Sequence, residues 1–310
     1  MISSELKGKL SRAPGTLFLL GVKRLFQFWQ RLGIHVVPNH FYEPIPDTRR
    51  LPASLWKSPS ACVGVNFNEA TQLELLQRFR DDYRPEYATL PAAKTEIPHQ
   101  YYSNNPSFKA VDGEILYSMV RHFKPSRIFE IGSGNSTYLS AQALLKNRES
   151  AGTSCELVAF EPYPNEVLRA GFPGLGALVP KQVQEIPWEE FAKLGENDIL
   201  FIDSSHVLKI GSDVQYELLE LLPRLKPGVV IHLHDIFLPA EYPHEWVNKR
   251  HIFWTEQYIL QAFLAFNDSF EVLWGGSYMH LRHSDKLKEA FPVYDPEKNW
   301  PGSFWIRKIK

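Results

Sequence analysis

RIFEIGSGNSTYL, residues 127–139, is the stretch that decides the fold. Its apolar first half predicts a buried strand, and Gly132 and Gly134 predict a turn that leads into a helix. Asn135 or Ser136 is placed to cap that helix. Glycines let a ligand approach the main chain, and the free amides at a helix start favour electron-rich groups. The stretch therefore predicts a nucleotide-type binding site.

Two carboxylates indicate which ligand this site takes. The third glycine of the dinucleotide fingerprint would fall at Thr137, so the pattern of pyrophosphate-binding sites is incomplete. Glu130 suits a ligand with a cationic amino acid portion, and Glu161, at the end of the next predicted strand, can accept hydrogen bonds from both ribose hydroxyls. S-adenosylmethionine has both features. A nicotinamide dinucleotide uses the same ribose acid and stays the alternative.

The composition bounds the class of protein. The 310 residues carry 34 Lys and Arg against 35 Asp and Glu, which argues against a nucleic-acid groove. Cys62 and Cys155 form neither a disulfide framework nor a metal motif, so a cytoplasmic, reducing compartment fits best. The apolar run at 17–22 is too short to span a bilayer, and the start lacks a signal-peptide layout.

Residues 15–32 mix apolar side chains such as Leu17 and Phe26 with basic ones such as Lys23 and Arg31. Such a basic amphipathic stretch can make peripheral contact with an anionic membrane. The favoured interpretation is a helix that packs on its own domain, or on a second copy of the chain in a homo-oligomer, and membrane contact is the alternative.

Strands and helices alternate from about residue 106 onward. Strands are expected at 127–131, 157–161, 177–183, 198–203, 229–233, 270–274 and 303–309, the last two without a helix between them. The pattern predicts an α/β, Rossmann-like fold. A seven-stranded, mostly parallel sheet would have helices on both faces and an antiparallel strand near its C-terminal edge. Residues 1–105 would form an N-terminal extension, with an amphipathic helix and Pro- and aromatic-rich loops, serving as a lid or an oligomer contact.

Polar side chains follow the fourth and fifth predicted strands. Asp203 and His206 follow the fourth, and His234 and Asp235 follow the fifth. Carboxylates and imidazoles at adjacent strand ends match a site for Mg²⁺, Mn²⁺ or Fe²⁺, which would lower the pKa of a substrate hydroxyl. His206, expected to be neutral near pH 7, would then take the proton. The alternative is that the carboxylates cap turns and the histidines, His232 included, are hydrogen-bonded core residues.

An aromatic segment follows the fifth strand and is predicted to form a substrate wall or lid. The residues assigned to it are Tyr242, Trp246, Trp254, Glu256 and Tyr258. The alternative is a surface loop anchored by aromatic packing.

These motifs resemble those of class I S-adenosylmethionine-dependent methyltransferases, over roughly residues 100–310. E-I-G-S-G-N-S-T, starting at Glu130, is similar to the first motif of the family, and Phe160-Glu161-Pro162 is similar to its acidic second strand end. The resemblance implies that residues 106–310 form a class I methyltransferase domain. The cofactor contacts that it implies are Glu130, Gly132, Ser133, Gly134, Ser136, Glu161, Pro162, Glu185 and Asp203.

D-S-S-H and H-L-H-D-I-F resemble more narrowly a bacterial subgroup that includes metal-dependent sugar and natural-product O-methyltransferases. This resemblance implies metal ligation by Asp203, His234 and Asp235, with His206 as the base. His234 stands where the metal-binding relatives have Glu, which favours a softer ion or no metal. The function implied is O-methylation of a saccharide or small natural-product hydroxyl, with His206, Asp203 and Asp235 as catalytic residues.

Two other functions stay open. An NAD(P)-dependent oxidoreductase is disfavoured by Thr137 and Glu130. A non-catalytic, membrane-associated scaffold with a vestigial cofactor fold is disfavoured by the intact D-x-x-H and H-D sets.

Overall fold

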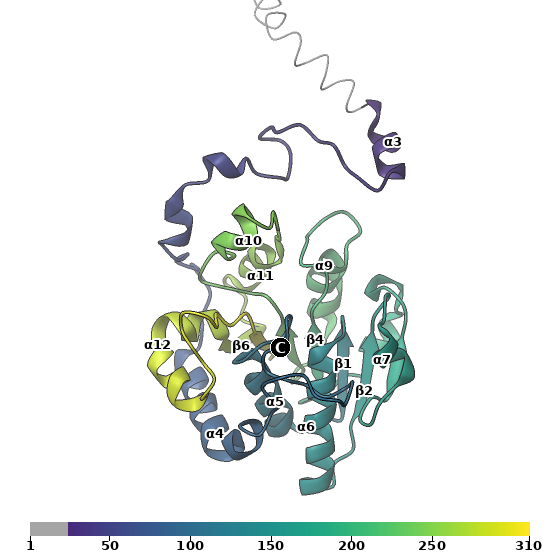
Figure 1. The fold of residues 1–310 in the computed structure, drawn as a ribbon, viewed down its shortest axis with the longest axis vertical. Coiled ribbons are helices and arrows are strands. Elements are labelled where there is room, and N and C mark those ends of the chain that lie inside the picture. The colour runs from purple at the N-terminus through teal and green to yellow at the C-terminus, as the bar shows by residue number, and fades with distance from the viewer. Residues whose placement is uncertain (1–23) are drawn as a thin grey trace, which may run out of the picture. The chain divides into compact units, whose positions relative to one another are not determined.

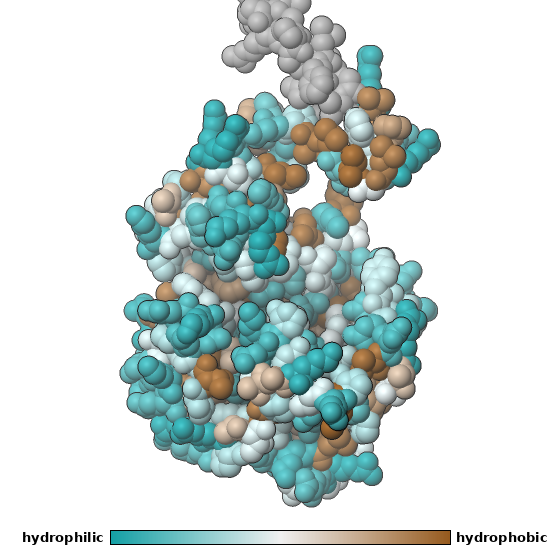
Figure 2. Space-filling view, in the orientation of Figure 1, coloured by the Kyte–Doolittle hydropathy of each residue, from teal (hydrophilic) through white to brown (hydrophobic). Residues whose placement is uncertain are grey.

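The computed structural model describes residues 24–310, and the chain divides into two units after Leu55. The first unit holds helix α3 (Phe26–Arg31) and the 3₁₀ turn η1 (Thr48–Arg50). Hydrophobic residues show on its surface in Figure 2. Phe41 and Tyr42 are among its exposed large side chains. The predicted amphipathic stretch at 15–32 lies outside the described residues as far as position 23, so its membrane contact stays a prediction.

The second unit, Trp56–Lys310, is built on one seven-stranded sheet with the order β3-β2-β1-β4-β5-β7-β6 (Figure 1). The five strands from β1 to β5 run parallel, and β7 is antiparallel to both of its neighbours. The predicted fold class is therefore confirmed. The strands are β1 (Arg127–Ile131), β2 (Glu156–Phe160), β3 (Ala177–Val179), β4 (Ile199–Ile202), β5 (Val230–Leu233), β6 (Phe270–Gly275) and β7 (Phe304–Lys308).

Helices cover both faces of the sheet because alternate residues of a strand point to opposite sides. In β1, Ile128 joins one apolar core, whereas Phe129 and Ile131 join the other. The first core also takes α4 (Glu69–Tyr87), α5 (Asp112–Phe123), α6 (Asn135–Ala151), α7 (Glu166–Ala170) and α12 (Gly276–Ala290). The second takes α8 (Trp188–Phe191), α9 (Asp213–Tyr216), the π turn η4 (Glu217–Leu221) and α11 (Glu256–Leu264), which begins shortly after α10 (His244–Asn248).

Helix α12 corrects the sequence analysis, which expected no helix between the last two strands. Its apolar pattern is sparse, and Met279, Leu287 and Ala290 are the apolar side chains that it buries. The backbone of His283 is also non-helical, which interrupts the helical spacing. A pattern so weak and interrupted does not predict a helix from periodicity alone.

Residues 56–105 pack within the second unit, although the sequence analysis placed the boundary between 105 and 106. Glu86 in α4 receives hydrogen bonds from Arg121 in α5, with the Nε to Oε2 distance at 2.7 Å. The hydroxyl of Tyr87 donates to the carbonyl of Ala290 in α12 at 2.9 Å. Helix α4 is therefore tied to the sheet domain by buried polar contacts. None of the helices within residues 24–310 is long and apolar enough to cross a bilayer.

Candidate active site

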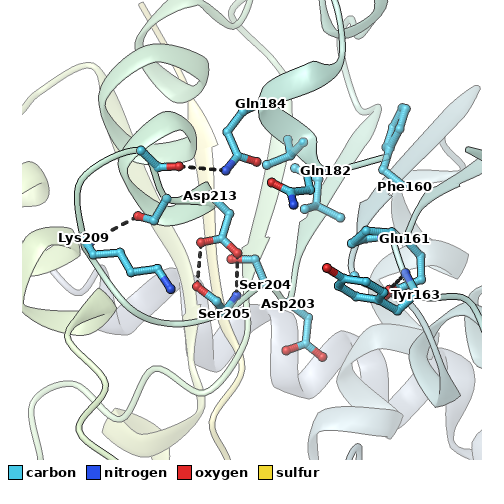
Figure 3. A pocket seen from close by; sticks show the side chains of 16 residues that line it. Phe160, Glu161, Tyr163, Gln182, Gln184, Asp203, Ser204, Ser205, Lys209 and Asp213 are labelled. Carbon is cyan, nitrogen blue, oxygen red and sulfur yellow. Dashed lines mark hydrogen bonds between the residues drawn. The ribbon is translucent and has the colours of Figure 1, made fainter. Parts of the chain in front are cut away.

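A cavity of about 440 Å³ opens at the carboxyl ends of β1, β2 and β4 (Figure 3). Each of these strands contributes one of the predicted residues: Gly132 after β1, Glu161 after β2 and Asp203 after β4. Glu161 and Tyr163 form one wall, and the Glu161 Oε1 accepts a hydrogen bond from the Tyr163 amide at 2.7 Å. This is the edge of the sheet where ligands bind in open parallel folds.

Gly132 lies where the loops after β1 and β4 touch. It has a φ of +79°, and a Cβ there would lie 2.0 Å from the main-chain oxygen of Asp203. The Gly132 amide donates to the carbonyl of Phe160 in β2. The Asp203 amide donates to the carbonyl of Ile131 in β1, which ties the start of the loop after β4 to β1. Only glycine fits both the conformation and the space.

Gly134 is extended and open, with no atom within 4 Å of the position of a Cβ. It is the residue that precedes α6, a place that the sequence analysis gave to Asn135 or Ser136. The Gly134 amide donates to Thr137 Oγ1 at 2.9 Å, which closes the start of the helix. Thr137, the residue that breaks the dinucleotide fingerprint, thus has a structural role of its own.

Glu130 is a buried acid with incomplete hydrogen bonding. Its side chain is fully buried, Ser136 Oγ donates to Oε1 at 2.6 Å, and Oε2 has no partner among residues 24–310. Burial, reinforced by the nearby charges of Asp203 and Glu161, raises the pKa of Glu130 to about 8. A cation bound nearby would favour the ionised form, which is the behaviour expected of a group that faces the ammonium or sulfonium of a cofactor.

Replacing Glu130 by Gln should flatten the pH dependence of stability. The folded state keeps a proton on Glu130 up to about pH 8, whereas the unfolded state loses it near the ordinary value of 4.5. Stability therefore falls as pH rises between these values. In urea titrations, we expect the free energy of unfolding of Glu130→Gln to fall less between about pH 5 and about pH 8 than that of the wild type. Equal slopes in this variant, the wild type and the exposed control Glu96→Gln would contradict the assignment.

The other predicted cofactor residues divide into two groups. Pro162 lines the cavity, and Ser133 has a buried hydroxyl without a partner in the described part of the chain. Glu185 is exposed and accepts a hydrogen bond from the Gln182 amide at 3.0 Å, so it closes its own turn and does not line the cavity. Gln184 does line it, and its buried Oε1 has no partner among residues 24–310. In the turn chosen from the sequence, the residue that lines the cavity is thus Gln184, the neighbour of Glu185.

His206 lies among carboxylates from three segments. Its Nε2 is 3.2 Å from Asp203 Oδ1 and 3.9 Å from Asp235 Oδ2, and its Nδ1 is 2.8 Å from Glu256 Oε2. Burial alone would lower the pKa of His206, but Asp203 and Glu256 outweigh it and raise the pKa well above 6.5. This shift runs against the expectation that His206 is neutral near pH 7. Glu256, one of its two causes, lies 50 residues further along the chain, so its contact with His206 was not expected.

The pKa values of the two neighbouring acids shift in opposite directions. Burial favours the neutral form of Asp203, but His234 and the hydrogen bond from His206 hold its pKa at about 2. Burial raises the pKa of Asp235, with the charges of His234 and His206 opposing the rise. The carboxylate paired with His206 beside the cavity is therefore that of Asp203.

The two histidines of β5 and its end have different surroundings. His232 is fully buried, stacks on Phe201 with 4.1 Å between ring centroids, and has its pKa lowered well below 6.5 by burial. His234 lies against Phe108, with its Nε2 3.7 Å from Asp235 Oδ1. His232 is thus a core residue, whereas His234 contributes to the electrostatics of the site.

The predicted metal ligands do not form a metal site as they are placed. Asp203, His234 and Asp235 lie close together, but within residues 24–310 no group of three or more His, Cys, Asp or Glu residues is arranged to hold a metal ion. His206 Nε2 faces both Asp203 and Asp235, so these two carboxylates are directed at an imidazole.

The predicted substrate wall lies partly on His206. The Trp254 ring contacts the His206 ring with 4.2 Å between centroids, and Trp246 packs perpendicular to Trp254. Tyr242 is buried, and its hydroxyl accepts a hydrogen bond from the Gln257 amide. The exposed Tyr258 donates to Glu241. Glu256 is only 1% exposed, so it is a partner of His206 and not a wall residue.

A scan against protein-family models gives a match for residues 129–236 to the family described as "Methyltransferase domain". The match runs from β1 to just beyond β5, so this part of the chain is a methyltransferase domain. It is an S-adenosylmethionine-dependent methyltransferase. An uncharacterized protein of Archaeoglobus fulgidus is 30% identical over 172 residues, which cover 52% of this chain and 75% of that protein.

Similar solved structures include CmcI and the plantazolicin methyltransferase BamL, the latter in complex with a substrate analogue and S-adenosylhomocysteine. CmcI is 12% identical with a TM-score of 0.39, and the match covers 73% of this chain and 84% of that one. BamL is 14% identical with a TM-score of 0.38, and the match covers 78% of this chain and 97% of that one. Likenesses this distant add nothing to the assignment of substrate or metal.

Proposed function

We propose that this methyltransferase transfers a methyl group to a hydroxyl of a saccharide or small natural product. The observation that carries the proposal is the contact of His206 with Asp203, because Asp203 also lines the cofactor cavity. A proton-accepting group thus stands next to the place where the methyl donor would bind. The acceptor class rests on the aromatic surface around Trp254 and on the family resemblance.

The cavity residues suggest the orientation of the cofactor. Glu161 would bind the ribose hydroxyls, and the turn that contains Gln184 would contact the adenine. The methionine portion would then lie toward Gly132 and Glu130, which directs the sulfonium toward Asp203. Catalysis is largely positioning, because methyl transfer needs the acceptor oxygen in line with the carbon–sulfur bond.

The charges around His206 determine when its ring carries a proton. In the free protein Asp203 and Glu256 keep His206 protonated. With a sulfonium bound beside Asp203, the charge of that carboxylate would be offset and the pKa of His206 would fall, so the ring could lose its proton to solvent. Nε2 then accepts the proton of the acceptor hydroxyl as the oxygen–carbon bond forms. S-adenosylmethionine would supply the methyl group, keep the electron pair of the broken carbon–sulfur bond on sulfur, and leave as S-adenosylhomocysteine.

Calorimetric titration with S-adenosylhomocysteine, with NAD⁺ as the control ligand, tests the cofactor site. We expect the first ligand to bind and the second not to bind. Glu161→Ala should weaken binding about 10- to 100-fold, because hydrogen bonds to a charged group contribute about 1.5–3 kcal/mol. The exposed control Glu96→Ala should bind as the wild type does. Binding of NAD⁺ alone would replace the proposal by an oxidoreductase, and binding of neither ligand to folded protein would favour the scaffold.

A further inference from the structure

We propose that Glu256 is a positioning residue for catalysis, because it holds the His206 imidazole through Nδ1 and thereby fixes Nε2 on the side of Asp203. The catalytic consequence rests on the proposed function. The contact of Glu256 with His206 Nδ1 does not depend on that function and can be tested without an acceptor.

The contact itself is short and shielded from water. Glu256 Oε2 lies 2.8 Å from His206 Nδ1, and the two residues are 1% and 5% exposed. Trp254 covers a face of the ring, which restricts rotation of the imidazole. With Nδ1 bound to Glu256, Nε2 is the ring nitrogen left to face Asp203 and an acceptor.

The backbone of the same helix start is attached to His206 as well. The amides of Thr255 and Glu256 both donate to the His206 carbonyl, at 2.9 and 3.2 Å. The Leu208 amide donates to Thr255 Oγ1 at 2.8 Å. His206 has a φ of +60°, so its ring direction depends on this backbone conformation being held. The aromatic segment and the loop after β4 thus meet at His206 and Leu208.

A purely structural role does not account for the Glu256 side chain. The start of α11 is already held by main-chain bonds and by Thr255. Glu256 Oε1 has no hydrogen-bond partner within residues 24–310, and a second buried acid, Glu217, lies near enough to interact electrostatically. An incompletely bonded buried carboxylate is costly, and an apolar residue would be cheaper here. The carboxylate instead fixes the orientation of the His206 ring through its contact with Nδ1.

Imidazole ¹⁵N–¹H spectra of the S-adenosylhomocysteine complex test the hold directly. The wild type should show a downfield, slowly exchanging Nδ1 proton for His206. We expect this signal to be lost in Glu256→Ala and shifted upfield in Glu256→Gln, which keeps the volume if the alanine variant fails to fold. Glu96→Gln, the same change at an exposed glutamate, is the matched control and should keep the signal. An unchanged His206 signal in folded Glu256→Gln or Glu256→Ala would overturn the proposal.

Turnover measures the catalytic consequence once an acceptor is in hand. Glu256→Ala should lower kcat about 10- to 100-fold without changing the KM for S-adenosylmethionine, because loss of a whole general base costs about 10²–10⁴-fold. Glu256→Gln should recover part of the loss, and the exposed control Glu96→Gln should resemble the wild type. An unchanged kcat in Glu256→Ala contradicts positioning. Full turnover in His206→Ala would instead contradict the proposed function and leave the spectral result standing.

Discussion

A Gly132→Ala variant is expected to lose cofactor binding and a large part of its stability. The new Cβ would lie 2.0 Å from the Asp203 carbonyl oxygen, and that oxygen belongs to the main chain and cannot rotate away. The backbone φ of +79° is also unfavourable for alanine. Strain and overpacking together should cost about 2–4 kcal/mol. Relief requires the loops after β1 and β4 to separate, which moves Asp203 and opens the cofactor cavity.

The neighbouring glycine supplies the control for this experiment. Gly134→Ala is the same chemical change in the same loop, but its Cβ meets no atom within 4 Å and its backbone is extended. Its free energy of unfolding should stay within about 0.5 kcal/mol of the wild type. Urea denaturation and titration with S-adenosylhomocysteine measure both effects. A Gly132→Ala protein with wild-type stability and affinity would show that the two loops are not in the contact described.

Replacing His206 by Ala should lower turnover about 10²–10⁴-fold while the affinity for S-adenosylhomocysteine changes little. The ring is not among the residues that line the cofactor cavity, so cofactor binding does not need it. The free imidazole is held protonated by Asp203 and Glu256. The wild-type rate should therefore rise with pH, since only the neutral ring accepts a proton, and this rise should disappear in the variant.

An exposed histidine in the aromatic segment provides a control for the general effects of removing an imidazole. His251 is exposed and has a φ of +55°, so His251→Asn is compatible with the backbone and should keep wild-type turnover. Rates at several pH values, measured under saturating S-adenosylmethionine, separate the two variants. Equal turnover of His206→Ala and wild type would remove His206 from the mechanism.

Local patterns predicted most of the sheet, because each strand is a short apolar run ended by a polar residue. β1 and β4 illustrate this, since both end at residues that border the cofactor cavity. Helix α12 could not be predicted in the same way because its buried positions are few and its backbone is irregular at His283. The π turn at Glu217–Leu221 is a second departure from regular helical spacing, which periodicity does not predict.

The site was predictable where chemistry follows a strand directly and was not where distant segments meet. Asp203 and His206 follow β4, so their proximity could be expected. The contact of His206 with Glu256 joins segments 50 residues apart, and Glu256 acts together with Asp203 to raise the pKa of the ring. Gln184 was passed over for Glu185 because a sequence does not show which residue of a turn faces inward.

The bond between the Gly134 amide and Thr137 bears on how easily such a protein could exchange one cofactor for another. A dinucleotide site needs glycine at position 137 so that the helix can approach its strand. In this chain Thr137→Gly would also remove the acceptor that closes the first turn of α6. An intermediate with that single change would have a frayed helix start before it had gained any affinity for pyrophosphate. A route from one cofactor to the other therefore has to repair the start of the helix in the same step.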